Sequence, residues 1–205
     1  MKQVAQAISI LFHPLLLITL GTFFILEFDN IYHVALDGKT LMIYLLIILM
    51  GTFIFPVNII FLIQRLMRQD LSVYMQERED RKIPLLIATI CVLLTFYIFS
   101  YKIGYRAPHL VRGYLLGTAS AILSAALINM KYKISLHAIG VGGTLALLCF
   151  LQQSAYTDLR WIIAGWIVLS GLVCWARLYL QSHTLSEIYA GFLCGFTLIF
   201  LLIRI

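Results

Sequence analysis

The chain has 205 residues, of which 62% are hydrophobic and 12% are charged, and its mean hydropathy is +0.97. This composition excludes an ordinary soluble globular protein and predicts an all-α fold, a polytopic transmembrane helical bundle. The polar gaps are short, so residues 1–205 are expected to form one domain. The net charge of +6 indicates basic loops at a membrane surface. No nucleic-acid partner is expected, because no soluble basic face exists to follow a phosphate backbone.

Apolar segments that approach the roughly 20 residues of a membrane-spanning helix follow one another along the chain. They cover residues 4–26, 40–64, 84–101, 113–130, 134–153, 161–181 and 185–204. The bundle is therefore expected to have about six or seven spans. Pro14 and Pro56 lie inside segments and are expected to kink them, whereas Pro84 opens a segment at a position where its missing N–H costs nothing.

A count of these spans places the N-terminus on the same side of the membrane as three polar loops. The loops are residues 65–83, 131–133 and 182–184. Every candidate for chemistry lies in or next to one of them, so we expect the three loops to converge at one membrane face.

The stretch WARLYLQSHTLSEIYAG, residues 175–191, places ionisable side chains between the last two spans. Glu187 follows His183 by one helical turn, so its carboxylate can accept from the ring N–H and fix the tautomer. A neutral imidazole held in this way is a nucleophile. Arg177 precedes His183, and its planar guanidinium suits phosphate oxygens. Thr184 and Glu187 also form a capping-box pattern, which is compatible with this role.

A second group of candidate residues lies at the start of the fifth apolar segment, where His137 follows Ser135 by two residues. The free N–H groups and the dipole of a helix start favour an anion there. With Arg78, Arg81 and Lys82 before the third segment, these residues imply a phosphate ligand. Two histidines can divide phosphoryl transfer, one attacking phosphorus and one protonating the leaving oxygen. The histidines form no metal-binding spacing, so neither a metal nor a cofactor is expected.

Residues 75–195 resemble the type 2 phosphatidic acid phosphatase superfamily in motif order and spacing. The third motif of that family, S-R-x5-H-x3-D with a following glycine, is similar to the pattern of Ala176, Arg177, His183, Glu187 and Gly191. Its second motif, P-S-G-H, is similar to Ile134, Ser135, Leu136 and His137. Its first motif, K-x6-R-P, is loosely echoed by EREDRKIP at 77–84.

This resemblance implies a metal-independent phosphohydrolase of membrane lipid phosphates or polyprenyl diphosphates that works through a phosphohistidine. It implies His183 as the nucleophile, His137 as the general acid and Glu187 as the residue that orients His183. The phosphate-binding residues that it implies are Arg177, Ser135, Arg81, Arg78 and Lys82.

Some positions depart from the family pattern, and Leu136 in particular replaces the glycine that would let the backbone approach a phosphate closely. The departures leave open a narrowed substrate range, slow turnover, or a non-catalytic bundle that binds or transports lipid phosphates. A phosphotransferase that uses the same site is a further alternative.

The expected location is the bilayer of a bacterial inner membrane. The N-terminal side carries nine Lys and Arg residues against six on the other side, which the positive-inside rule reads as cytoplasmic. Without the four cations assigned to phosphate the counts are five and six, and the rule does not decide. Bacterial members of the resembled family usually present the site to the periplasm, so the periplasmic face is favoured.

Overall fold

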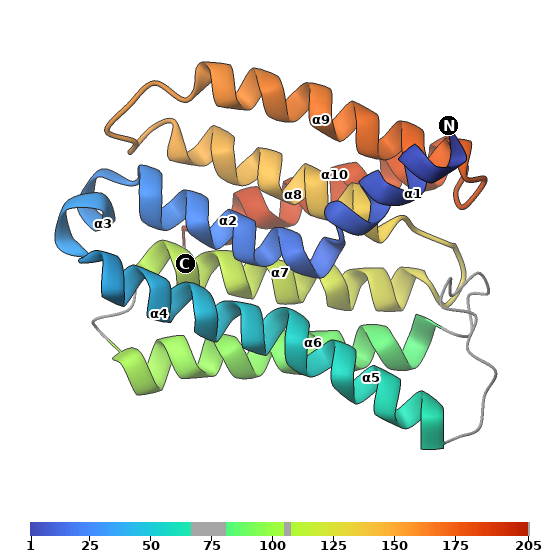
Figure 1. Cartoon of the computed structure of the whole chain (residues 1–205), viewed down its shortest axis with the longest axis horizontal. Coiled ribbons are helices and arrows are strands. Elements are labelled where there is room, and N and C mark those ends of the chain that lie inside the picture. Colours follow the sequence, from blue (N-terminus) through green and yellow to red (C-terminus); the bar gives the residue numbers. More distant parts are fainter. Residues whose placement is uncertain (67–80, 105–107, 205) are drawn as a thin grey trace.

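The computed structural model describes residues 1–66, 81–104 and 108–204, and these residues form helices and no β-strand. In chain order the helices are α1 (Lys2–Leu11), α2 (Pro14–Phe28), α3 (Asn30–Ala35), α4 (Gly38–Leu49), the π-helix η1 (Met50–Ile54), α5 (Phe55–Leu66), α6 (Lys82–Tyr97), the π-helix η3 (Ile98–Ile103), α7 (His109–Ile128), α8 (Leu136–Leu151), α9 (Arg160–Tyr179) and α10 (Leu185–Leu202). They lie side by side as a bundle, with the N-terminus at one end (Figure 1). The predicted all-α bundle is confirmed.

Within the described residues, five helical stretches are long and apolar enough to cross a membrane, namely Gly38–Ile63, Lys82–Ile103, His109–Ile128, Arg160–Tyr179 and Leu185–Leu202. The pair α1 and α2 meets the same test as a unit but bends by 52°, which raises the number to six. The remaining apolar helix, α8, has only 16 residues. The chain is therefore an integral membrane protein.

The first predicted span, 4–26, is broken because Pro14 stands at the first position of α2. Its fixed φ suits a helix start, but it has no N–H to bond back into α1. The ring of His13 caps α2, since its Nδ1 accepts from the backbone N of Leu15 at 3.3 Å. Pro56 does not break the helical path in this way. It follows the π-helical turn η1, and the chain continues as α5.

The short helix α8 lies at the centre of the bundle, packed against α2, α7, α9 and α10. Eleven of its 16 residues are buried, and they face all sides of the helix. Such an all-round apolar helix is typical of a helix that is enclosed by protein. Because its neighbours cover it, α8 need not match the thickness of the bilayer.

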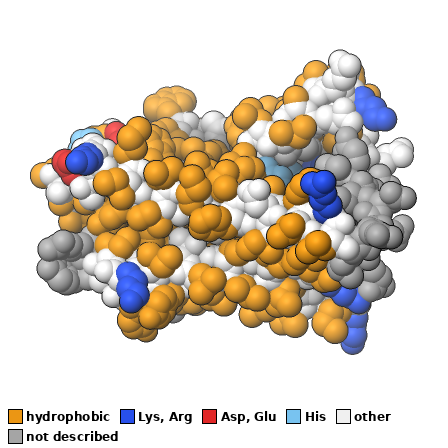
Figure 2. Space-filling model, turned by 60° about the horizontal axis from the view of Figure 1, so that its bottom comes forward, with side chains coloured by type: hydrophobic (Ala, Val, Ile, Leu, Met, Phe, Trp, Pro, Cys, Tyr) orange, Lys and Arg blue, Asp and Glu red, His pale blue; other side chains and the backbone are white. Residues whose placement is uncertain are grey.

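The outer helices instead turn large apolar side chains outward. Figure 2 shows hydrophobic side chains over the middle of one face, with Lys and Arg side chains toward its two ends. The exposed apolar side chains include Leu46, Phe55, Phe61, Leu62, Leu86, Leu94, Val168, Leu172, Leu193 and Leu201. A soluble protein rarely exposes such a continuous surface, whereas a bilayer covers it.

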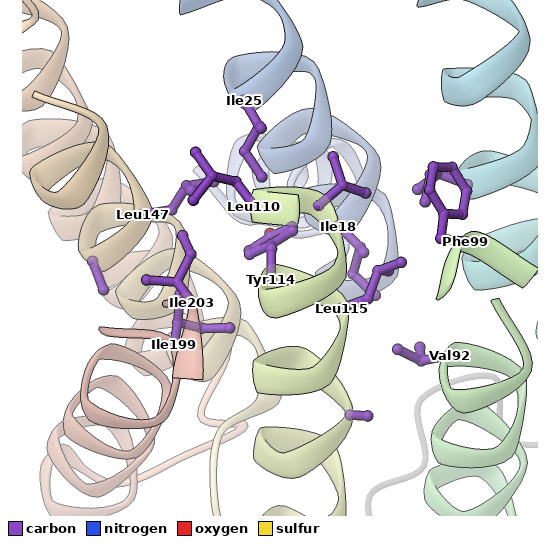
Figure 3. Packing of buried hydrophobic residues seen from close by; sticks show 14 of the residues in the cluster. Ile18, Ile25, Val92, Phe99, Leu110, Tyr114, Leu115, Leu147, Ile199 and Ile203 are labelled. Carbon is purple, nitrogen blue, oxygen red and sulfur yellow. The ribbon is translucent and has the colours of Figure 1, made fainter. Parts of the chain in front are cut away.

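The main buried cluster joins α2, α7, α8 and α10 around Tyr114 (Figure 3). The Tyr114 hydroxyl donates to the carbonyl oxygen of Leu17 at 3.2 Å, so this buried polar group is satisfied. Ile199 and Ile203 of α10 and Leu147 of α8 belong to the same cluster. This cluster fixes α10 against α7 and α8.

Glycines bring the backbones of α8 and α10 into direct contact. A Cβ atom at Gly195 would lie 2.1 Å from the carbonyl oxygen of Ile139, and one at Gly142 would lie 2.4 Å from that of Phe192. Gly191, one turn before Gly195, leaves the same kind of space. Small residues spaced in this way allow membrane helices to approach closely.

The substitution Gly195→Ala should therefore destabilise the bundle by about 1–3 kcal/mol, because the added methyl group meets backbone rather than a movable side chain. Thermal unfolding in detergent measures the effect. Gly171→Ala is the matched control, since a Cβ there, on α9, meets nothing within 4 Å. Equal melting temperatures for the two variants would contradict the close contact of α8 and α10.

Candidate active site

His183 and Glu187 form a buried pair at the turn between α9 and α10. Nδ1 of His183 lies 2.7 Å from Oε2 of Glu187, and the exposed fractions of the two side chains are 2% and 14%. An ionised carboxylate only accepts, so the Nδ1–H of the ring donates to it. In the neutral ring, Nε2 then carries the lone pair. The tautomer is the one that a nucleophilic histidine needs.

The same carboxylate oxygen of Glu187, Oε2, both caps α10 and contacts His183. The backbone N of Thr184 donates to Oε2 of Glu187 at 3.2 Å, and the backbone N of Glu187 donates to Oγ1 of Thr184 at 3.4 Å. The predicted capping box is confirmed. The first turn of α10 therefore holds the carboxylate that meets His183.

Ser135 joins the start of α8 to the start of α10. Its backbone N donates to the carbonyl oxygen of Glu187 at 3.3 Å, and its Oγ accepts from the backbone N of Ala138 at 3.4 Å. A Cβ at Gly191 would lie 2.6 Å from the Ser135 carbonyl oxygen, so the glycine permits this contact. The hydroxyl of Ser135 thus caps α8, and its phosphate-binding role stays a prediction.

Three residues that depart from the family pattern, Ile134, Leu136 and Ala176, serve packing. Ile134 and Ala176 are buried, with exposed fractions of 2% and 0%. Leu136 packs against two of the buried hydrophobic clusters. The aliphatic side chain of Leu136 therefore contributes to the core at the point where the resembled family has a glycine.

Arg177, in the last turn of α9, reaches toward α1. Its Nη1 donates to Oγ of Ser9 at 3.2 Å. Its Nε is buried and has no hydrogen-bond partner within the described part of the chain. A buried guanidinium N–H without a partner is a donor that an anion can use.

Three cations act electrostatically on His183. Burial lowers the pKa of His183, and the positive charges of Arg81, Arg177 and Lys133 lower it further. Both effects favour the neutral ring. Lys133 was not among the predicted residues, although it stands only two positions before Ser135.

The predicted cations of the first loop do not all join this cluster. Arg81 is buried, with an exposed fraction of 8%, whereas Lys82 is exposed. Successive helical residues point about 100° apart, so neighbours at the start of α6 face different surroundings. Arg78 lies outside the described residues.

His137 and Arg177 both bond to Ser9 of α1, which links His137 to the same cluster. Its Nε2 lies 2.9 Å from the carbonyl oxygen of Ser9, and a carbonyl only accepts, so Nε2 carries a proton. The positive charge of Arg177 also acts on the His137 ring. The ring of His13 packs edge-on at a centroid distance of 6.2 Å. The sequence reading missed Ser9, which no local motif marks.

The described residues contain no group of three or more His, Cys, Asp or Glu side chains that could hold a metal ion. The cluster instead combines two histidines, one carboxylate and several cations. Such a set can bind an anion and transfer a proton.

Comparison with known protein families matches residues 128–205 to the PAP2 superfamily. We call residues 128–205, which match this family model, the PAP2 segment. The resemblance is therefore confirmed for this part of the chain, which holds both histidine motifs, and it supports a phosphatase-type enzyme in general. Ser9 and Arg81 lie outside the PAP2 segment. Searches of the curated proteins and of the solved structures found no match.

Removing a cation should change the titration of His183. The charge of Lys133 disfavours the imidazolium, so Lys133→Ala should raise the pKa of His183 and move its protonation to higher pH. NMR titration of the ring, assigned by the signal lost in His183→Ala, measures this shift. Lys131→Ala removes a cation two positions away that is exposed, and it should leave the pKa unchanged. An unchanged titration in Lys133→Ala would contradict the electrostatic account.

Proposed function

We propose that this protein is a metal-independent phosphohydrolase of lipid phosphates or diphosphates in which His183 forms a phosphohistidine. The observation that carries the proposal is the buried contact between His183 and Glu187, with Arg81, Arg177 and Lys133 around it. A neutral, oriented imidazole next to cations is suited to attack a phosphate group. The PAP2 segment supports the phosphatase class.

In the first step, Nε2 of His183 attacks phosphorus, and the bond from phosphorus to the lipid oxygen breaks. The phosphorylated ring is positively charged, and the carboxylate of Glu187 stabilises it. His137 gives the leaving oxygen a proton. His137 acts here as the imidazolium, a form that the negative charge of a bound lipid phosphate would favour. Since its Nε2–H is held by the Ser9 carbonyl, the transferred proton is the one on Nδ1. In the second step, His137 takes a proton from water, the hydroxide oxygen bonds to phosphorus, and His183 is released with inorganic phosphate.

The cations would hold the phosphate oxygens while charge moves to the leaving group. Arg177 offers its buried Nε–H, and Arg81 and Lys133 add positive charge. Ser135 and Arg78 are further proposed phosphate ligands. None of these contacts requires a metal ion.

The substrate would come from the bilayer. The exposed apolar helices indicate that lipid surrounds the bundle, and the site lies at one end of it, near the level of headgroups. Lipids of suitable chemistry are phosphatidic acid, phosphatidylglycerol phosphate, polyprenyl diphosphates and phosphorylated lipid A. We place the site on the periplasmic face of a bacterial inner membrane.

Phosphate release by the detergent-solubilised protein from this lipid panel tests the proposal. The wild type should release phosphate in the presence of EDTA, and His183→Ala should lose the activity because the nucleophile is missing. His33→Ala is the matched control, because His33 lies in α3 and stacks on Tyr156, away from the site. It should retain activity.

Other outcomes would support the alternatives. A wild type that releases no phosphate, yet binds a lipid phosphate as well as His183→Ala does, would be a binding or transport bundle. Release that requires an added lipid or sugar acceptor would identify a phosphotransferase. Loss of activity in EDTA that returns with a metal ion would contradict metal-free chemistry.

The charge of Glu187 can be separated from its hydrogen bonds by substitution. The amide oxygen of Glu187→Gln can accept from both the backbone N–H of Thr184 and the Nδ1–H of His183, but it carries no negative charge to stabilise the phosphorylated ring. The kcat should fall by at least about 100-fold, while the melting temperature changes little. Glu187→Ala should lower both. A near-normal kcat for Glu187→Gln would show that the reaction does not need the negative charge of this carboxylate.

A further inference from the structure

The N-terminal helix α1 packs against α9 and carries a buried serine into the site. Ser9 and Ala5, one turn apart, are the buried residues of α1. The hydroxyl and the carbonyl of Ser9 each accept a hydrogen bond from a side chain of the site. Its hydroxyl accepts from Nη1 of Arg177 at 3.2 Å, and its carbonyl accepts from Nε2 of His137 at 2.9 Å.

The carbonyl of Ser9 is available because α1 ends there. In a continuing helix the backbone N of His13 would donate to Ser9, but it donates to the carbonyl of Ile10 at 3.2 Å. The chain then bends by 52° before α2, which begins at Pro14. The helix end therefore leaves a carbonyl that His137 satisfies. This end also carries the negative pole of the helix dipole, which suits neighbouring cations.

We propose that α1 completes the active site and that Ser9 is a positioning residue for Arg177 and His137. For its kinetic readout this inference rests on the proposed phosphohydrolase function. The PAP2 segment begins at residue 128, so nothing in that match assigns a role to α1.

The contacts of Ser9 decide which atoms remain for a phosphate. Nη1 of Arg177 is engaged by the Ser9 hydroxyl, and the buried Nε, which has no partner in the described ranges, is left for an anion. Nε2 of His137 is engaged by the Ser9 carbonyl, so Nδ1 is the ring nitrogen left for proton transfer. Ser9 thus sets the orientation of both side chains without contacting the phosphate.

The test substitutes the hydroxyl and leaves the carbonyl in place. Ser9→Ala should raise KM for the lipid phosphate, and the Kd for inorganic phosphate measured by thermal shift, by about 3- to 10-fold, because Arg177 loses a hydrogen bond that orients it. The kcat should fall less than the affinity. Ser9→Thr keeps a hydroxyl and should restore both constants to within about twofold of the wild type.

Ser170→Ala is the matched control. Ser170 is a buried serine of α9, and its hydroxyl has no hydrogen-bond partner among the described residues. It should leave KM and the Kd for inorganic phosphate unchanged. This control removes the same atom from a similar environment without touching the site.

The proposal is overturned if Ser9→Ala and Ser170→Ala give the same Kd for inorganic phosphate, even if Ser9→Ala lowers the melting temperature. If the wild type binds inorganic phosphate but hydrolyses no lipid, the proposed function fails, and the Kd values alone decide the role of Ser9. If the wild type neither hydrolyses lipid phosphates nor binds inorganic phosphate, both proposals fail.

Discussion

The hydrogen bond between the starts of α8 and α10 is the constraint on which the site depends. The backbone N of Ser135 donates to the carbonyl of Glu187, and Gly191 leaves room for the two backbones to meet. The same turn of α10 holds the carboxylate that contacts His183. A change in the distance between these helices would therefore move both histidine motifs. Close packing of α8 and α10 through small residues thus holds the polar groups of the site in place.

Positive charge is concentrated near one buried side chain. Arg81, Arg177 and Lys133 all act on the buried ring of His183. Arg81 is buried, and Arg177 and Lys133 are half-buried. Removing these charges from water costs free energy, and ionisable groups within a membrane protein are retained mainly where they serve a function. A bound phosphate would offset this cost, because it supplies the opposite charge and accepts from the buried Nε–H of Arg177. The site is therefore matched to an anion more than to a neutral ligand.

Distant segments contribute to this cluster. Residues 128–205 supply both histidines, yet Arg81 comes from the start of α6 and Ser9 from α1. The bend at Pro14 is what exposes the carbonyl of Ser9 to His137. A proline that interrupts a span thus has a local effect on the backbone and a long-range effect on the site.

The sequence by itself determined the features that depend on residues within one helical turn of each other or on the length of an apolar segment. The helices, the membrane location, the capping box of Thr184 and the contact of His183 with Glu187 were all predictable, because each follows from local spacing. Only the tertiary structure decided that Ser9 meets Arg177, 168 positions away, and that Lys133 joins the cluster while Lys82 faces outward. These outcomes depend on how each helix is rotated and where it bends. Rotation and bending are fixed by packing against other helices, which no local pattern records.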